Sequence, residues 1–167
     1  MIQFTLRMLS VSDCTDRYLS WLLDPDNRLK LGNLDGINTL DDLMHSVSER
    51  HSDPSCRLLG IFCGSTHVGN LQARLSSDDT CILSILIGDK RYRGRGLGRA
   101  AMESFLSNRS LLPSCVGKVS YYACINSLNP SSLRLFESLG FAKVPMSLWP
   151  QSIDRCDSSV LYALHPK

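Results

Sequence analysis

The sequence lacks any long uninterrupted run of apolar residues, although apolar residues make up 43% of its 167 positions. A membrane-spanning helix needs about 18 or more such residues in a row, so the pattern excludes one. The N-terminal residues also lack the charged and apolar regions of a secretory signal peptide. We therefore expect a cytoplasmic protein.

Paired cysteines and clustered metal ligands are also absent. The seven cysteines form no C-x-x-C pair, and their odd number does not suit a set of disulfides. Most lie in apolar stretches, where a thiol behaves as a small hydrophobic group. The four histidines lie apart from them, so the sequence predicts a reduced protein with no disulfide and no metal site. The cysteines are Cys14, Cys56, Cys63, Cys81, Cys115, Cys124 and Cys156, and the histidines are His45, His51, His67 and His165.

A strong charge of either sign is missing as well. Charged residues make up 20% of the chain and the net charge is +2, which is too small to favour general nucleic-acid binding. The basic residues gather between positions 90 and 99, which suits a local anionic ligand. The length suits one domain with a full core, and no repeat or linker divides the chain. We predict a single domain over residues 1–167.

The most informative segment follows an apolar strand predicted at residues 81–87. It is a basic turn with the pattern Arg-x-x-Gly-x-Gly, and a helix follows it. We call residues 93–98 the glycine loop. Glycines let a backbone turn tightly and point successive N–H groups at one position. A helix that begins there adds unpaired N–H groups and the positive end of its dipole, so the segment predicts a phosphate or pyrophosphate site. Further positive charge is expected from Lys90, Arg91, Arg93, Arg95 and Arg99.

Two other phosphate-binding motifs fit less well. A P-loop requires Gly-x4-Gly-Lys-Ser/Thr, but Val119 follows the single Gly-Lys pair. Gly96, Gly98 and Ala101 match the dinucleotide fingerprint Gly-x-Gly-x-x-Gly/Ala. That fingerprint follows a strand directly, and an acid ends a second strand about 20 residues later. The sequence meets neither condition.

A second informative segment lies about 30 residues downstream and is typical of a capped helix. Asn129 is a strong N-cap, and Pro130 occupies the first helical position. Gly140 is expected to end the helix in a left-handed conformation, which lets Phe141 pack back on Phe136. The apolar stripe of this helix is Leu133, Phe136 and Leu139.

Together the two segments resemble the GNAT superfamily of N-acetyltransferases. The glycine loop matches the acetyl-CoA loop of that superfamily, Gln/Arg-x-x-Gly-x-Gly/Ala. Asn129 with Ser132 begins its Asn-x-x-Ser/Ala…Gly-Phe segment. The resemblance covers roughly residues 80–142 and is weaker over residues 1–79. It implies an acetyl-CoA-dependent N-acetyltransferase that transfers acetyl directly to a primary amine and uses no metal.

The predicted order of elements, β-α-α-β-β-β-α-β-α-β, matches that superfamily. The resemblance implies an α/β fold with a mixed, mostly antiparallel sheet that is splayed in the middle and flanked by helices. Asp13 or Ser12 is expected to cap the first helix and Thr39 the second, with a loop over residues 24–38. Strands are expected at residues 2–8, 58–63, 67–75, 81–87, 119–125 and 159–164, and helices at 13–23, 39–50, 130–139 and from the glycine loop onward.

The resemblance also implies where acetyl-CoA binds. Backbone N–H groups of the strand before the glycine loop polarise the thioester carbonyl. The loop amides hold the pyrophosphate, and the second segment borders the pantetheine arm. The implied cofactor-binding residues are Leu86, Ile87, Gly88, Arg93, Gly94, Arg95, Gly96, Leu97, Gly98, Arg99, Asn129, Ser132 and Phe136.

Two departures from the superfamily concern proton transfer. Many members have a tyrosine at the position of Phe136, which cannot protonate the leaving thiolate. An ordinary thiol pKa of about 8.5 makes protonation by water sufficient. The strand at residues 81–87 lacks the usual glutamate base, and Ser84 is its only hydroxyl. No catalytic residue is therefore assigned. The alternative bases are Asp35, His45, Asp78, Asp79 and Tyr122.

The first 79 residues are expected to shape the acceptor side, with Tyr18, Trp21 and Leu22 as candidate pocket residues and Asn70 facing either the cleft or water. Three features look like two branches of the superfamily: the Arg7…Trp21…Asp24 opening, Gly69-Asn70-Leu71, and the Asn129-x-x-Ser132 form. One acetylates protein N-termini, as in ribosomal-protein modification, and the other acetylates nucleotide-linked amino sugars. We favour the amino-sugar branch, acting as a monomer or homodimer.

Two hypotheses from other functional classes stay open. A non-catalytic acyl-CoA-binding domain would account for the missing glutamate and for Phe136. A small nucleic-acid-binding domain would use the basic residues of the loop, but Tyr92 is the only aromatic residue beside them, so no stacking platform is evident.

Overall fold

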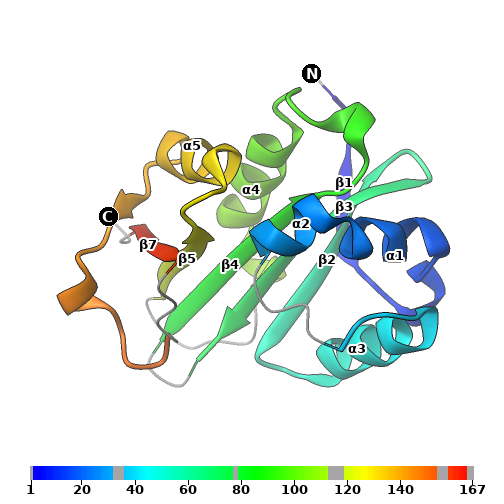
Figure 1. The fold of residues 1–167 in the computed structure, drawn as a ribbon, viewed down its shortest axis with the longest axis horizontal. Helices are drawn as coiled ribbons and strands as arrows, with labels where there is room; N and C mark the ends of the chain where they lie inside the picture. The colour runs from blue at the N-terminus through cyan, green and yellow to red at the C-terminus, as the bar shows by residue number, and fades with distance from the viewer. Residues whose placement is uncertain (1, 32–35, 77–78, 113–118, 154–157, 165–167) are drawn as a thin grey trace.

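The computed structural model describes residues 2–31, 36–76, 79–112, 119–153 and 158–164, with the side chain of Arg109 left out. Within these residues, seven strands form one sheet in the order β1-β2-β3-β4-β5-β7-β6 (Figure 1). Neighbouring strands are antiparallel except for β4 and β5, which run parallel. The strands are β1 (Thr5–Met8), β2 (Cys56–Cys63), β3 (Thr66–Leu75), β4 (Thr80–Ile87), β5 (Ser120–Asn126), β6 (Ala142–Lys143) and β7 (Ser159–Leu164).

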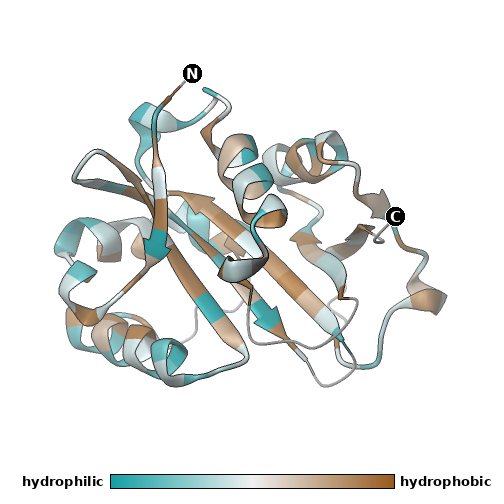
Figure 2. Ribbon diagram, turned by 180° about the vertical axis from the view of Figure 1, so that it is seen from behind, coloured by the Kyte–Doolittle hydropathy of each residue, from teal (hydrophilic) through white to brown (hydrophobic). Residues whose placement is uncertain are grey.

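Helices cover both faces of the sheet because the long central strands are apolar on both sides. Leu86 of β4 is buried in one cluster with Trp21 and Leu43. Leu83, an odd number of positions away on the same strand, is buried in another cluster with Phe105 and Phe136. The hydrophobic strands and the helices on the rear face are seen in Figure 2. The α-helices are α1 (Asp16–Leu23), α2 (Pro25–Leu31), α3 (Leu40–Ser52), α4 (Leu97–Ser107) and α5 (Pro130–Ser138).

The sheet splays at the junction of β4 and β5. The two strands pair only where Thr80 to Ile82 meet Ser120 to Tyr122, although β4 continues to Ile87. Beyond the pairing, the second half of β4 has a hydrogen-bonding edge with no described strand beside it. The predicted α/β fold, with its mixed and mostly antiparallel splayed sheet, is confirmed.

Most predicted elements are confirmed within one or two residues. The last strand, β7, has the predicted bounds, and β5 is shifted by one residue from the predicted 119–125. Thr39 caps α3, with its side chain accepting from the N–H of Asp42. The hairpin of β2 and β3 turns at Gly64, which has a φ of +59°. No described helix is long and apolar enough to cross a membrane.

Three predicted features near the N-terminus need correction, and one short strand near the C-terminus was not predicted. The first strand covers Thr5–Met8 rather than all of residues 2–8, and β6 was not predicted. The segment predicted as one helix over residues 13–23 is a 3-10 turn, Val11–Asp13, followed by α1. The cap of α1 is Thr15, whose hydroxyl accepts from the N–H of Tyr18, because it directly precedes the first helical residue.

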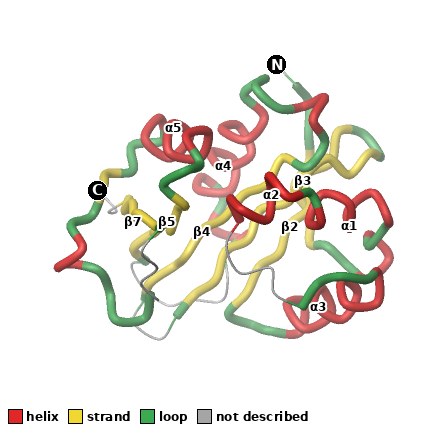
Figure 3. Tube along the Cα trace, viewed as in Figure 1, coloured by secondary structure: helices red, strands yellow, loops and turns green. Residues whose placement is uncertain are grey.

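The loop expected over residues 24–38 contains a helix, α2 (Figure 3). Asp24 caps it, since its carboxylate accepts from the N–H of Asp26 at 3.0 Å. Pro25 lies in the first helical position, where its missing N–H costs nothing. The Asp-Pro pair therefore marks a helix start here rather than a turn. The amide of Asn27 then donates to the carbonyl of Trp21 at 2.7 Å and fixes α2 against α1.

Candidate functional site

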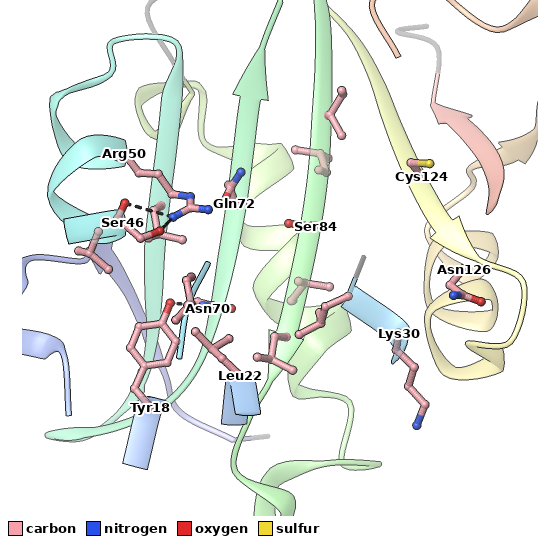
Figure 4. A pocket seen from close by; sticks show the side chains of 18 of the residues that line it. Tyr18, Leu22, Lys30, Ser46, Arg50, Asn70, Gln72, Ser84, Cys124 and Asn126 are labelled. Atoms are coloured by element: carbon pink, nitrogen blue, oxygen red, sulfur yellow. Dashed lines mark hydrogen bonds between the residues drawn. The ribbon is translucent and has the colours of Figure 1, made fainter. Parts of the chain in front are cut away.

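A cleft of about 530 Å³ lies at the splay of the sheet. Its walls come from α1, α3, the middle of β3, the second half of β4, and the facing side of β5 (Figure 4). Leu86 lines it on one side of the V, and Cys124 and Asn126 on the other. A cleft of this size accommodates an ordinary small-molecule ligand.

The ladder between β3 and β4 shows which peptide groups of β4 face the splay. The N–H of Ser76, just after β3, donates to the carbonyl of Thr80, so the peptide groups of Thr80 face the β3 side. On the other edge, the carbonyl of Asp79 accepts from the N–H of Ser120. Peptide direction alternates along a strand. The peptide groups of Ile85 and Ile87 therefore point toward the edge from which β5 has departed.

The glycine loop has the backbone shape predicted for an anion site. Gly94 and Gly96 have φ values of +69° and +78°, which are left-handed conformations suited to glycine, and α4 begins directly afterwards. Among the described residues, the N–H groups of residues 94–99 form no backbone hydrogen bond of good geometry, although residues 93–96 form a turn. Six successive donors are thus available at the positive end of a helix dipole.

Arg93, the first residue of the loop motif, points its side chain back into the protein. Its Nε donates to the carbonyl of Ile87 at 2.7 Å, and its Nη2 donates to the carbonyl of Gly88 at 3.1 Å. Nη2 also lies 3.3 Å from the side-chain oxygen of Asn27. Arg93 therefore ties the glycine loop to the end of β4 and to α2.

Most of the other basic side chains near the loop are neutralised by carboxylates. Lys90 pairs with Asp24 at 3.2 Å, and Arg99 pairs with Glu103 at 2.9 Å. Arg91 pairs with the buried Asp89 at 2.8 Å, and Arg17 contacts the same carboxylate. Hydrogen bonds from Arg91 lower the pKa of Asp89 to about 2. The expected basic cluster is therefore corrected: of its five members, Arg95 is the one exposed cation with no partner among the described residues.

Gly88, at the end of β4, makes room for an aromatic ring. A Cβ atom there would lie 2.0 Å from the ring of Trp21. Trp21 is buried in the cluster that α1 and α3 form on the sheet, so it belongs to the core rather than to the wall of the cleft. The packing of Trp21 on Gly88 fixes the position of the backbone where β4 ends and the chain continues into the glycine loop.

The second predicted segment has the expected local structure. Asn129 caps α5, accepting from the N–H of Ser132 at 3.2 Å and donating to its hydroxyl at 3.0 Å. Gly140 has a φ of +88°, and the rings of Phe136 and Phe141 pack edge to face at 5.0 Å. The ring of Phe136 is buried in the core cluster and holds α5 against the sheet.

The acceptor half of the cleft contains a polar group that the sequence only partly indicated. Asn70 of β3 lines the cleft and donates to the hydroxyl of Tyr18 at 2.6 Å. Burial raises the pKa of Tyr18 to about 12, so its hydroxyl stays protonated. Leu22 lines the cleft as expected. Figure 4 shows Tyr18 and Asn70 at one end of the space, with Ser84 of β4 further along it.

None of the described candidate bases lies in the cleft. His45 is exposed and lies 3.3 Å from Glu49. Asp79 precedes β4, at the end of the strand opposite to the glycine loop. Tyr122 packs against the cluster of Trp149 and its neighbours. The remaining candidates, Asp35 and Asp78, lie outside the described residues, as do Cys115, Cys156 and His165.

Arg50 and Gln72 line the cleft and were missed from the sequence. Arg50 follows Leu43 and Val47 by seven and three positions in a helix, so it shares their inward-facing side. This helical spacing was the available signal for Arg50. Gln72 alternates with the buried Leu71 and Ala73 of β3, which directs it to the cleft face.

Comparison with known proteins identifies a family for this chain and several solved structures with a similar fold. The acetyltransferase (GNAT) family matches residues 18–141 of the chain. An acetyltransferase from Thermus thermophilus superposes with a TM-score of 0.72 at 24% identity, over 98% of this chain and 97% of that one. No curated protein sequence matches significantly. The described residues contain no group of three or more His, Cys, Asp or Glu side chains able to hold a metal ion.

Two further solved structures are similar and contain ligands. Spermidine N-acetyltransferase from Vibrio cholerae, in complex with CoA and spermine, has a TM-score of 0.72 at 15% identity, over 96% of this chain and 93% of that one. RimL, a ribosomal alpha-N-protein acetyltransferase in complex with CoA, has a TM-score of 0.72 at 13% identity, over 99% and 96%. These similarities concern the fold.

Proposed function

Because the chain belongs to the acetyltransferase (GNAT) family, we propose that it transfers the acetyl group of acetyl-CoA directly to a primary amine, which we place on a nucleotide-linked amino sugar. The observation that carries this proposal is the row of N–H groups at residues 94–99, which form no backbone hydrogen bond of good geometry with the described residues and lie next to the open edge of β4. The glycine loop supplies N–H donors for a diphosphate, and the open edge of β4 supplies a slot for an acyl chain.

The pyrophosphate of acetyl-CoA is proposed to bind the N–H groups of residues 94–99. Leu97 contributes its N–H while its side chain stays buried. Arg95 adds the one exposed, unpartnered charge of the described loop. Asn129 and Ser132 bond to each other at the start of α5, and we propose that they position the pantetheine side of the site.

The thioester is proposed to lie along β4 between Leu86 and Gly88. Peptide alternation assigns the N–H of Leu86 to β3, so Ile87 and its neighbour Ile85 are the donors that face the splay. A donor there stabilises negative charge that develops on the carbonyl oxygen during attack. Such fixed donors are typically worth 10²–10³ in rate, or about 3–4 kcal/mol.

The reaction itself needs few side chains. The neutral amine nitrogen forms a bond to the thioester carbon, the carbon–sulfur bond breaks, and the thiolate leaves with the electron pair. Since no described acid or histidine lines the cleft, the ammonium proton goes to bulk water before attack. As the amide forms, its nitrogen loses a second proton to water, and the thiolate takes a proton from water, for which a thiol pKa of about 8.5 is adequate.

The charge of the cleft bears on the acceptor. Its described lining includes Lys30 and Arg50 and no carboxylate. A polyamine such as spermine, bound by the similar Vibrio cholerae enzyme, would place cations beside these cations. A nucleotide-linked amino sugar carries a negatively charged diphosphate and suits the lining better. A protein N-terminus, the substrate type of the similar RimL structure, is the alternative acceptor.

The test is a thiol-release assay with acetyl-CoA and a panel of amines that spans amino sugars, peptides and polyamines. Turnover of an amine with one acetylated product per thiol released supports the proposal. Tight CoA binding with no turnover on any amine would instead support a non-catalytic acyl-CoA-binding domain, the second candidate, which the acid-free cleft favours. Nucleic-acid binding is less suited to this loop, because Lys90, Arg91 and Arg99 are already paired with carboxylates.

A further inference from the structure

Arg50 stands out in the cleft because its positive charge has no carboxylate partner among the described residues. It is half-buried in the last turn of α3 and lines the same cleft as Asn70 and Ser84. Figure 4 shows its guanidinium extending from α3 toward Gln72 of β3, while Lys30 lies at the other end with its ammonium directed away. A partly buried cation without a counter-ion carries a desolvation cost, which a bound anion would offset.

The hydrogen bonds of Arg50 leave one edge of the guanidinium without a partner among the described residues. Its Nη1 donates to the carbonyl of Ser46 at 3.1 Å and contacts the hydroxyl of the same residue. Its Nε is buried and has no hydrogen-bond partner among the described residues. Nη2 likewise forms no hydrogen bond with a described residue. The Nε–Nη2 edge of arginine is the fork that binds two oxygens of one carboxylate or phosphate.

From this geometry we propose that the acceptor carries a carboxylate or phosphate group, which binds the Nε–Nη2 edge of Arg50 while its amine faces β4. This inference rests on the proposed acetyltransferase function and specifies the acceptor side of that site. Ser46 holds Nη1, so the fork is oriented before the acceptor enters. Neutral hydrogen-bonding groups also line the cleft between Arg50 and β4. They belong to Asn70, Gln72 and Ser84.

A purely structural role for Arg50 makes a different prediction. A cation in the last turn of a helix stabilises that helix through its interaction with the helix dipole. In that case, the loss of the charge would lower stability without changing the choice of acceptor. The two roles are therefore distinguished by the ratio of kcat/KM for an anionic acceptor to that for a neutral one, and not by the activity on one acceptor.

The kinetic test uses Arg50→Gln and Arg50→Lys, with Arg57→Gln as the matched control. Arg57 is also half-buried, bonds to the carbonyl of Cys56 at 3.0 Å, and does not line the cleft. At saturating acetyl-CoA, kcat/KM is measured for glucosamine 6-phosphate against glucosamine, and for aspartate against ethanolamine. Comparing each ratio between wild type and variant cancels the intrinsic reactivity of the amines.

We expect the anionic acceptor of at least one pair to be preferred, and Arg50→Gln to reduce that preference at least tenfold. Arg50→Lys should retain part of it, and Arg57→Gln all of it. The phosphate pair and the carboxylate pair show which anion is recognised. An anion preference that is absent, or that survives in Arg50→Gln, would overturn the inference even though the enzyme acetylates amines.

A binding measurement separates this inference from the proposed function. Protein saturated with CoA, so that the glycine loop is filled, is titrated with inorganic phosphate and with acetate while the arginine Nε–H resonances are followed. Saturable movement of one resonance that is lost in Arg50→Gln supports the anion site, even if no amine is turned over. If no resonance moves with either anion, Arg50 does not form such a site.

Discussion

The Nε of Arg93 donates to the carbonyl oxygen of Ile87 at 2.7 Å, so the arginine that opens the loop motif closes back on the last residue of β4. A motif that appears in sequence as a source of phosphate-binding charge therefore acts as a clamp on the strand end. The charge offered to solvent comes from Arg95, two residues later.

This division of roles predicts different effects for two neighbouring variants. Arg93→Gln removes bonds to two backbone carbonyls and should lower the free energy of unfolding by about 2 kcal/mol, since hydrogen bonds to charged groups contribute about 1.5–3. Arg95→Gln should leave stability unchanged and weaken CoA binding mainly at low salt. Urea unfolding and calorimetry at two salt concentrations measure both effects. Equal losses of stability in Arg93→Gln and Arg95→Gln would contradict the proposed structural role of Arg93.

The conformation of Gly96 gives a second prediction. A β-branched side chain is strained at its φ of +78°, and would flatten or shift the row of N–H donors. Gly96→Val should therefore raise the dissociation constant of acetyl-CoA at least tenfold, or about 1.4 kcal/mol.

Gly64 provides a control for this strain. It has a φ of +59° and nothing within 4 Å of a Cβ, but it lies in the hairpin of β2 and β3. Gly64→Val should cost similar stability and leave acetyl-CoA affinity unchanged. Unchanged affinity in a folded Gly96→Val variant would reject the assignment of the loop.

Local signals account for what the sequence predicted well. The glycine loop, the Asn129 cap and the Gly140 stop depend on neighbours within a few positions, so their chemistry can be read from the chain. The pairing of Lys90 with Asp24 joins residues far apart in sequence, and no pattern of charges shows which partners will meet. Arg50 was missed for the same reason: its helix position was readable, but the cleft it faces is made by other elements.

The close packing of Trp21 on Gly88 gives a third prediction. A methyl group at position 88 would overlap the ring at 2.0 Å. Overpacking of this kind costs about 1–3 kcal/mol. Gly88→Ala should therefore lower the melting temperature, and Trp21→Leu should restore part of the loss in the double variant. Additive losses in the double-variant cycle would show that the two residues do not interact.

Stability is predicted to fall with acid in two stages. Burial lowers the pKa of His67 to about 4 from an ordinary 6.5. As pH falls, the unfolded chain takes up this proton first, so stability declines from about pH 6.5 to about pH 4. Asp13 and Asp89 have pKa values of about 2, which adds a second loss below their ordinary 3.8. Urea unfolding should show a flatter first stage in His67→Gln, and an unaltered slope would contradict the assignment.

The pH dependence of catalysis is expected to reflect the acceptor rather than a group of the enzyme. His67 titrates with a pKa near 4 and Tyr18 with a pKa near 12, and no described carboxylate lines the cleft. Between these limits the amine of the acceptor is the group that must lose a proton before attack. We therefore expect kcat/KM to rise about tenfold per pH unit up to the pKa of the amine, with no enzyme inflection near neutrality. The decisive measurement uses two acceptors whose amine pKa values differ by about two units. The plateau should move with the acceptor, because a fixed inflection shared by both would require a base in the protein.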